Sequence, residues 1–280
     1  MQAFAEFRHM PTDFWAMIKY VSETLGYTVR GQGIVRTYSI AEIGALISQN
    51  GIVVDYGTIE MAKLYFDMRA DLLNNVVQHN LMTASEAKEA FEEIFPLYHD
   101  KGFKCKLSMN KQKGEMRQIA FFTAIINIIT EDTIRHSSIF DGSLGFNDDP
   151  RGLIYVFDNE THIIGASSRR LDGAYPNIIN PRIVWEIKEY YYATTFGSRV
   201  ADGVYETQLD GYEFKDISYR SGKPITHVFF LDAYKTWWED GKSYLCRIID
   251  ILNSGLVDEV IVGREVFRRW PELLKSIIEE

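Results

Sequence analysis

Cysteine is scarce in this chain, because only Cys105 and Cys246 occur among 280 residues. Two cysteines exclude a disulfide framework and also a four-cysteine zinc or iron–sulfur site. Long apolar runs are missing too, since no segment reaches the roughly 20 apolar residues of a membrane span. The first residues carry an early acid, Glu6, and no long apolar run. We therefore expect no secretory signal, no membrane partner and a cytoplasmic protein.

Basic residues are also in short supply. Lys and Arg total 30 against 39 Asp and Glu, which gives a net charge of -9 and a pI near 5.3. A nucleic-acid-binding protein can still have this balance, because phosphate contacts depend on local patches. Residues 101–117 hold six basic residues and one acid, and such a stretch could follow a phosphate backbone, a solvated linker being the alternative. Its candidate contacts are Lys104, Lys106, Lys111, Lys113 and Arg117.

Composition permits a sizeable core, since 46% of the residues are hydrophobic and 14% are aromatic. A length of 280 residues allows one large or two ordinary domains. The basic stretch is the best candidate for a boundary. We expect a mainly helical region over residues 1–110 and an α/β domain over residues 111–280.

Two helices are predicted near the start of the helical region. Ser39-Ile-Ala-Glu42 forms a capping box, and Asn50-Gly51 ends the helix that it opens. A second helix is expected over residues 58–73. The pair is compatible with a helix-turn-helix or winged-helix module, in which exposed Lys63 and Arg69 would read DNA. Generic helical packing, with a strand in the connection, is the alternative.

The remaining elements follow from periodicity and from capping signals. Strands are expected at 182–188, 226–231 and 259–263, and helices at 87–95 (ended by Pro96), 116–130, 196–214 and 244–252. Alternation of strands and helices implies a central mixed β-sheet flanked by helices.

The strand at 182–188 carries an unusual pair of charges. Successive side chains of a strand point to opposite faces, so Glu186 and Lys188 share one face. The other face receives three bulky apolar side chains, Ile183, Trp185 and Ile187. The strand can therefore lie inside a sheet and still present an acid and a lysine together. A solvated cross-strand pair is the ordinary alternative for such a motif.

Asp172 is expected on the preceding strand or at its end. Gly173 and Pro176 favour a bend, so that the chain returns as a hairpin. Carboxylates from two adjacent strands make a hard oxygen site that suits Mg²⁺, which keeps several waters. Bound Mg²⁺ would lower the pKa of a coordinated water and neutralise charge on a phosphate, while Lys188 would orient the water or stabilise the developing charge.

Asp172 followed by Glu186-Ile-Lys188 resembles the signature of the PD-(D/E)xK nucleases, with Leu171 where the family name has proline. Many type II restriction endonucleases and recombination and repair nucleases carry this signature. The resemblance implies a restriction-endonuclease-like α/β fold, catalytic Asp172, Glu186 and Lys188, and Mg²⁺ held by the two acids. The scarcity of cysteine argues against the iron–sulfur members.

Accessory residues are suggested by the same resemblance. Gln208 and Tyr212 lie one helical turn apart and are similar to a Gln-x-x-x-Tyr element of the recombination nucleases; a core tyrosine beside a rim glutamine is the alternative. A third carboxylate often precedes the sheet in the family. Glu131 or Asp132 is the candidate, with a solvated acid at a helix end as the alternative.

The sequence thus predicts a Mg²⁺-dependent type II restriction endonuclease that cuts double-stranded DNA at a specific site. A palindromic target would favour a homodimer, and a cognate DNA methyltransferase would belong to the same system. Arg169 and Arg170 join the basic stretch as candidate DNA contacts. The alternatives are a recombination or repair nuclease without sequence preference, and a DNA-binding protein without catalysis.

Overall fold

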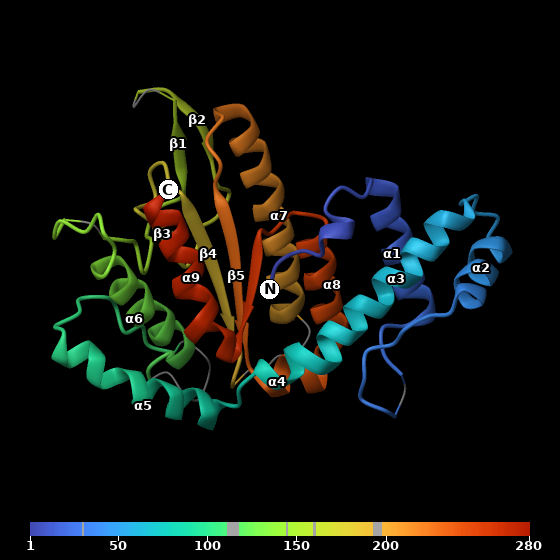
Figure 1. The fold of residues 1–280 in the computed structure, drawn as a ribbon, viewed down its shortest axis with the longest axis horizontal. Helices are drawn as coiled ribbons and strands as arrows, with labels where there is room; N and C mark the ends of the chain where they lie inside the picture. Colours follow the sequence, from blue (N-terminus) through green and yellow to red (C-terminus); the bar gives the residue numbers. More distant parts are fainter. Residues whose placement is uncertain (30, 111–117, 144, 159–160, 193–197) are drawn as a thin grey trace.

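The computed structural model describes residues 1–29, 31–110, 118–143, 145–158, 161–192 and 198–280. At its centre lies a β-sheet with helices against both faces, and a group of N-terminal helices extends to one side (Figure 1). No helix in these ranges has the length and apolar character needed to cross a bilayer.

The central sheet has the strand order β3-β4-β5-β6. Its strands are β3 (Gly173–Tyr175), β4 (Ile183–Glu189), β5 (Thr226–Asp232) and β6 (Glu259–Val262). β3 and β4 are antiparallel, whereas β4, β5 and β6 run parallel. A separate antiparallel pair consists of β1 (Tyr155–Phe157) and β2 (Ile163–Ala166). The prediction of a mixed sheet flanked by helices is confirmed at this level.

Helices occupy most of the remaining described chain. The α-helices are α1 (Thr12–Leu25), α2 (Ile40–Gln49), α3 (Tyr56–Leu72), α4 (Gln78–Asn80), α5 (Ala84–Asp100), α6 (Phe121–Arg135), α7 (Ser198–Ser221), α8 (Lys242–Asn253) and α9 (Val266–Glu279). Short 3₁₀ turns (Ala5–Phe7 and Gly263–Glu265) and π-helical turns (Leu73–Val77 and Lys235–Asp240) complete the set.

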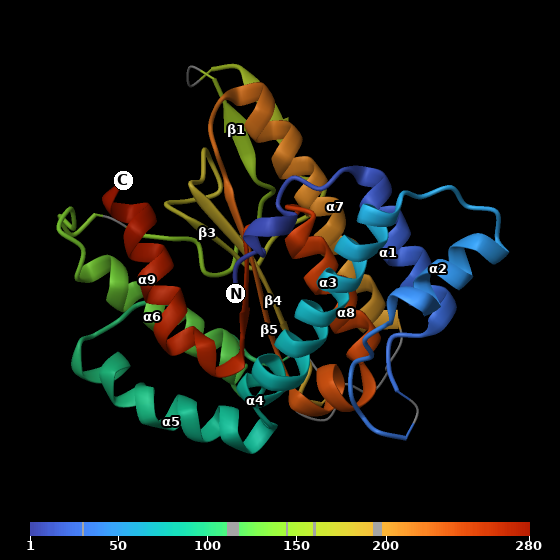
Figure 2. The ribbon, with the colours of Figure 1, turned by 45° about the vertical axis from the view of Figure 1, so that its right-hand side comes forward.

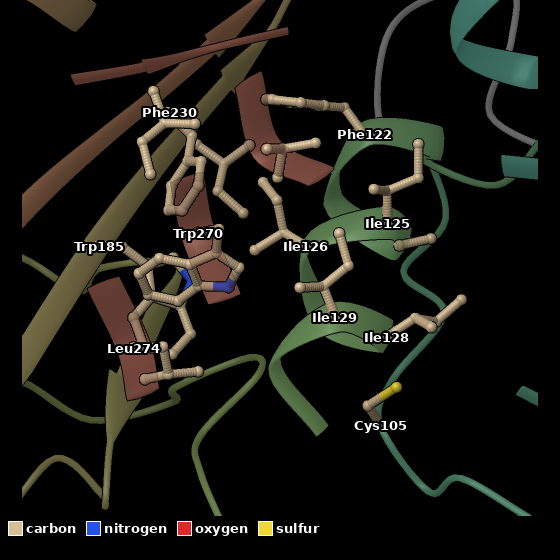
Figure 3. Packing of buried hydrophobic residues seen from close by; sticks show 14 of the residues in the cluster. Cys105, Phe122, Ile125, Ile126, Ile128, Ile129, Trp185, Phe230, Trp270 and Leu274 are labelled. Carbon is tan, nitrogen blue, oxygen red and sulfur yellow. The ribbon is translucent and has the colours of Figure 1, made fainter. Parts of the chain in front are cut away.

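One face of the sheet packs against α6 and α9, where the largest hydrophobic cluster lies (Figure 3). Trp185 of β4 meets Trp270 of α9 edge to face at a ring separation of 5.3 Å, and Phe230 of β5 lies 5.0 Å from the same indole. The side chains of β4 that point this way are the apolar ones predicted to do so. The opposite face is covered by α7 and α8.

The N-terminal helices have a small aromatic core of their own around Phe14, Tyr65 and Phe66. The capping box at Ser39 and Glu42 is present, as predicted. The connection between α2 and α3 contains no strand, and α3 begins at Tyr56 because Asp55 accepts a hydrogen bond from the Thr58 N–H.

Arg69 was predicted as an exposed DNA reader, and that prediction is wrong. Its side chain is fully buried and donates to Asp250 of α8 at 2.9 Å and to Ser22 at 3.1 Å. Lys63 does lie near the surface but pairs with Asp67. Arg69 thus joins the N-terminal helices to the central domain rather than facing a ligand.

Proline 96 does not end its helix, contrary to the prediction. α5 continues through Pro96 to Asp100. The rings of Phe91 and Phe95 of α5 pack against each other at a tilt, and Phe91 also contacts Phe121 of α6. We attribute the continuation to this packing, which offsets the one backbone hydrogen bond that proline removes. α5 therefore belongs to the same hydrophobic cluster as the sheet.

Candidate functional site

Asp172 lies directly before β3, at the point where that strand leaves β4. Its backbone N–H donates to the Trp185 carbonyl at 3.1 Å, and its Oδ2 accepts the Ile187 N–H at 2.8 Å. The aspartate side chain therefore replaces a strand carbonyl as the acceptor for β4. Among the described residues no hydrogen bond or ion pair engages Oδ1, and the side chain is exposed to solvent. One carboxylate oxygen is thus fixed while the other is available.

Glu186 and Lys188 lie on the same face of β4, as the alternation predicted. Glu186 is only 4% exposed. Its Oε1 is 2.6 Å from Lys188 Nζ and 3.0 Å from Arg169 Nη2. Two cations thus share a single carboxylate oxygen.

Helix α7 adds two acids that the sequence reading missed. Glu206 Oε2 accepts from Lys188 Nζ at 2.8 Å, and Asp210 accepts from Arg169 Nε at 3.1 Å. These acids are four residues apart and so share a helix face. Their spacing was visible in the sequence, but only the placement of α7 against β4 shows that this face points at Lys188.

Arg169 was predicted to contact DNA, but it lies half-buried at the centre of this cluster. Besides Glu186, its Nη2 is 3.0 Å from Asp210 Oδ2 and 3.8 Å from Glu206 Oε2. The loop between β2 and β3 carries it there. Arg169 is therefore part of the candidate site and is not free to bind a distant phosphate.

The charged groups of the cluster strongly affect one another's pKa values. Burial alone would raise the pKa of Glu186, but Lys188 and Arg169 together lower it, so this carboxylate is ionised at neutral pH. Burial opposes the charge of Lys188, yet Glu186 raises the pKa of the lysine further, so Lys188 stays protonated. It can donate a hydrogen bond or stabilise negative charge, but it cannot act as a base.

The two flanking acids behave differently. Burial, with the charge of Glu186 as a further cause, raises the pKa of Asp210 to about 7, although Arg169 opposes the shift. Desolvation and then Glu186 also raise the pKa of Asp172. Water reaches the exposed side of Asp172, which limits the size of that shift. With four carboxyl groups and two cations, the cluster has an excess of acid that favours an additional cation.

The donor set fits Mg²⁺ better than a softer metal, since it consists of carboxylate oxygens. The supporting observation is Glu186 Oε2, which is buried and has no hydrogen-bond partner among the described residues. Leaving a buried carboxylate oxygen unpartnered is costly. In those same parts of the chain, no three His, Cys, Asp or Glu side chains are grouped to hold a metal. A metal here would have Asp172 and Glu186 as protein ligands and would rely on water for the others.

Residues 82–277 match the family model described as domain of unknown function DUF7687. The chain belongs to the DUF7687 family. Residues 1–76 match a second model, domain of unknown function DUF7690. Neither the curated proteins nor the solved structures contain a match.

The DUF7687 match contains the sheet, the acidic cluster and α5, and the two models meet between residues 76 and 82. The sequence predicts a boundary near residue 110. α5 shares its hydrophobic cluster with α6 and the sheet.

Glu131 does not join the site. It lies on α6, which covers the face of the sheet that carries Trp185, whereas Glu186 points to the face under α7. Its Oε2 accepts the backbone N–H groups of Lys104 and Cys105 at 2.8 and 2.6 Å. Glu131 therefore orders the segment before α6. The neighbouring Asp132 pairs with Lys101 at 2.9 Å.

Gln208 and Tyr212 share a face of α7, as expected, but it is not the face that carries Glu206 and Asp210. Both line a cleft against α1. Tyr212 is exposed, so the alternative of a core tyrosine is not what the structure has.

Among the described residues, the other basic side chains predicted to contact DNA do not gather at the acidic cluster. Lys104, Lys106 and Arg170 are exposed, and Lys106 pairs with Asp149. The predicted contacts Lys111, Lys113 and Arg117 lie outside the described residues.

Proposed function

We propose that the chain is a Mg²⁺-dependent endodeoxyribonuclease with a site like that of the PD-(D/E)xK nucleases. The observation that carries the proposal is the convergence of Asp172, Glu186 and Lys188 at the junction of two antiparallel strands, with an unpartnered buried oxygen on Glu186. A solvated cross-strand pair would not place Glu186 in the interior.

Each residue has a role that its environment supports. Asp172 and Glu186 would hold Mg²⁺, which supplies positive charge for the scissile phosphate. Lys188 is held as a cation and can stabilise negative charge on the phosphate or orient the attacking water. Arg169 balances the acids of α7 and keeps Glu186 ionised.

Double-stranded DNA is the proposed substrate, cut at a specific sequence by a cytoplasmic restriction enzyme. A homodimer would suit a palindromic target, and a DNA methyltransferase of the same specificity would protect the host. No observation favours the recombination-type alternative, because Gln208 and Tyr212 face away from the acidic cluster.

Plasmid cleavage with Mg²⁺ tests the proposal. Asp172→Asn and Lys188→Met should each lower the cleavage rate by at least about 100-fold, because each removes a group that acts on the reacting phosphate. Lys275→Met is the matched control: this lysine is exposed on α9 and should leave the rate unchanged. Thermal unfolding of every variant would show that the fold is intact.

The size pattern of the DNA products distinguishes a sequence-specific restriction enzyme from a nuclease without sequence preference. Discrete fragments support restriction, whereas a smear supports cleavage without sequence preference. If folded wild-type chain cuts no DNA with Mg²⁺ or Mn²⁺, or if the variants cut as fast as wild type, the nuclease proposal is wrong.

A further inference from the structure

A cleft of about 480 Å³ lies between α1 on one side and α7 and α8 on the other. Figure 2 shows α1 beside these two helices. Gln208 and Tyr212 line the cleft from the side of α7 that faces away from the acidic cluster. The cleft is therefore a second site, separated from Glu186 by the body of one helix.

The cleft is basic although the chain is acidic overall. Arg8, His9, Lys19 and Lys215 line it, and all four are exposed. Among the described residues none of the four lies within ion-pair distance of a carboxylate, although Lys215 donates to the Ser254 carbonyl at 3.3 Å and, from further away, its charge opposes the rise in the pKa of Asp258 that burial causes. The one acid in the lining is Asp250, which is buried and neutralised by Arg69. Three cationic side chains, Arg8, Lys19 and Lys215, gathered in one cleft of a molecule of net charge -9 favour an anionic ligand.

The cleft extends along α7. A neighbouring hollow of about 290 Å³ shares Lys19 and Gln208 with it and reaches Tyr205 and Arg247. Glu23 also lines this hollow and pairs with Arg247 at 2.6 Å, so Lys19 is its cation without an ion pair among the described residues. Tyr205 and Tyr212 are both more than half exposed. Aromatic side chains beside a row of cations are the arrangement on which bases stack while phosphates are neutralised.

We propose that this basic cleft, formed by Arg8, His9, Lys19, Lys215, Gln208 and Tyr212, binds the sugar–phosphate backbone of a nucleic acid. The elongated shape favours a chain of phosphates over a single anion. The choice of nucleic acid rests on the proposed function, since a nuclease must hold its substrate beyond the scissile bond. The basic cleft would do this on the far side of α7 from the acidic cluster.

Binding of a fluorescent 30-base-pair duplex, measured by anisotropy in EDTA, tests the proposal without cleavage. Lys19→Gln with Lys215→Gln should weaken binding about tenfold at low salt. The slope of log Kd against log salt should fall by about two, because each lost phosphate contact removes about 0.9. The matched control is Lys88→Gln with Lys275→Gln, which makes the same change in net charge at exposed positions on α5 and α9.

Three results would overturn the inference: no binding by wild type, equal weakening by the control pair, or full displacement of the duplex by stoichiometric pyrophosphate. The last would indicate a site for a small phosphate. The two proposals fail separately. Binding through the cleft without any Mg²⁺-dependent cleavage would reject only the nuclease, and cleavage with unaltered binding by the cleft variant would reject only the cleft.

Discussion

Acidic side chains on β4 and β5 are withdrawn from solvent in two different ways. Glu186 is surrounded by cations, which lower its pKa. Glu189 and Asp232 instead accept from neutral donors, among them the Phe122 N–H at the start of α6 and the Met82 N–H. Burial raises the pKa of each of these two acids to about 7. The cations around Glu186 keep this carboxylate negatively charged. The carboxyl groups of Glu189 and Asp232 instead join neighbouring elements through hydrogen bonds.

Asp232→Asn should flatten the pH dependence of stability. The unfolded pKa is about 4 and the folded pKa about 7. Between these values the folded carboxyl keeps a proton that the unfolded chain releases, so the free energy of unfolding falls as pH rises through this window, by up to about 4 kcal/mol. Asparagine does not titrate and should remove the part of the decrease that comes from Asp232, whereas Glu189 keeps its own contribution. Urea midpoints at pH 5 and 8 measure it.

Asp216→Asn is the control for that experiment, because Asp216 is exposed on α7 and pairs with Arg220. It should leave the wild-type pH dependence in place. An Asp232→Asn variant whose stability still declines from pH 5 to pH 8 as steeply as wild type would show that Asp232 is not the titrating group.

At the scale of elements, the hairpin of β3 and β4 depends on a close contact. Gly173 pairs with Trp185, and a Cβ placed on Gly173 would lie 1.8 Å from the indole. The indole is held in turn by Trp270 on α9. Glycine is thus required for the tryptophan to lie across the strand next to Asp172.

Gly173→Ala should lower the free energy of unfolding by about 2 kcal/mol or more, since the indole must leave its packed position. Because Asp172 is the adjacent residue, the rate of Mg²⁺-dependent DNA cleavage by Gly173→Ala should fall as well. Chemical denaturation provides the measurement.

Gly44→Ala serves as the comparison. Gly44 lies inside α2 with nothing within 4 Å of an added Cβ. Here alanine should stabilise by about 0.5–1 kcal/mol through helix propensity. If both alanine variants had the same effect, the close packing of Trp185 on Gly173 would not be what stabilises the hairpin.

At the scale of the whole molecule, a fully buried arginine–aspartate pair helps to join the two family modules. Arg69 of α3 and Asp250 of α8 are 2.9 Å apart, and Tyr65 also donates to Asp250. A charge left alone in this interior would be unsolvated. The N-terminal helices and the central domain are therefore expected to unfold together.

Asp250→Ala should cost about 3–5 kcal/mol, because it leaves Arg69 buried without its partner. In calorimetry the wild type should give a single unfolding transition. Asp250→Ala should unfold at a lower temperature or in two separate transitions. Asp216→Ala, which breaks an exposed pair, should change stability by less than about 1 kcal/mol. A wild type with two separate transitions would show that the modules are not coupled.

Much of the local structure could be predicted from the sequence. The alternation of β4 placed Glu186 and Lys188 on one face, and the capping box at Ser39 located the start of α2. These features depend on residues that are close together in the sequence, so the local sequence pattern is enough to predict them. The continuation of α5 through Pro96 was missed, because the packing to which we attribute it involves a helix far along the chain.

The sequence by itself determined the mixed α/β character, the common face of Glu186 and Lys188, and the shared face of Gln208 and Tyr212. Only the tertiary structure decided which helix covers which face of the sheet. That arrangement brings Glu206 and Asp210 of α7 to the site and leaves Glu131 of α6 on the other side. The reason is physical: periodicity specifies which way a side chain points from its own element, whereas its partners depend on how distant apolar surfaces pack.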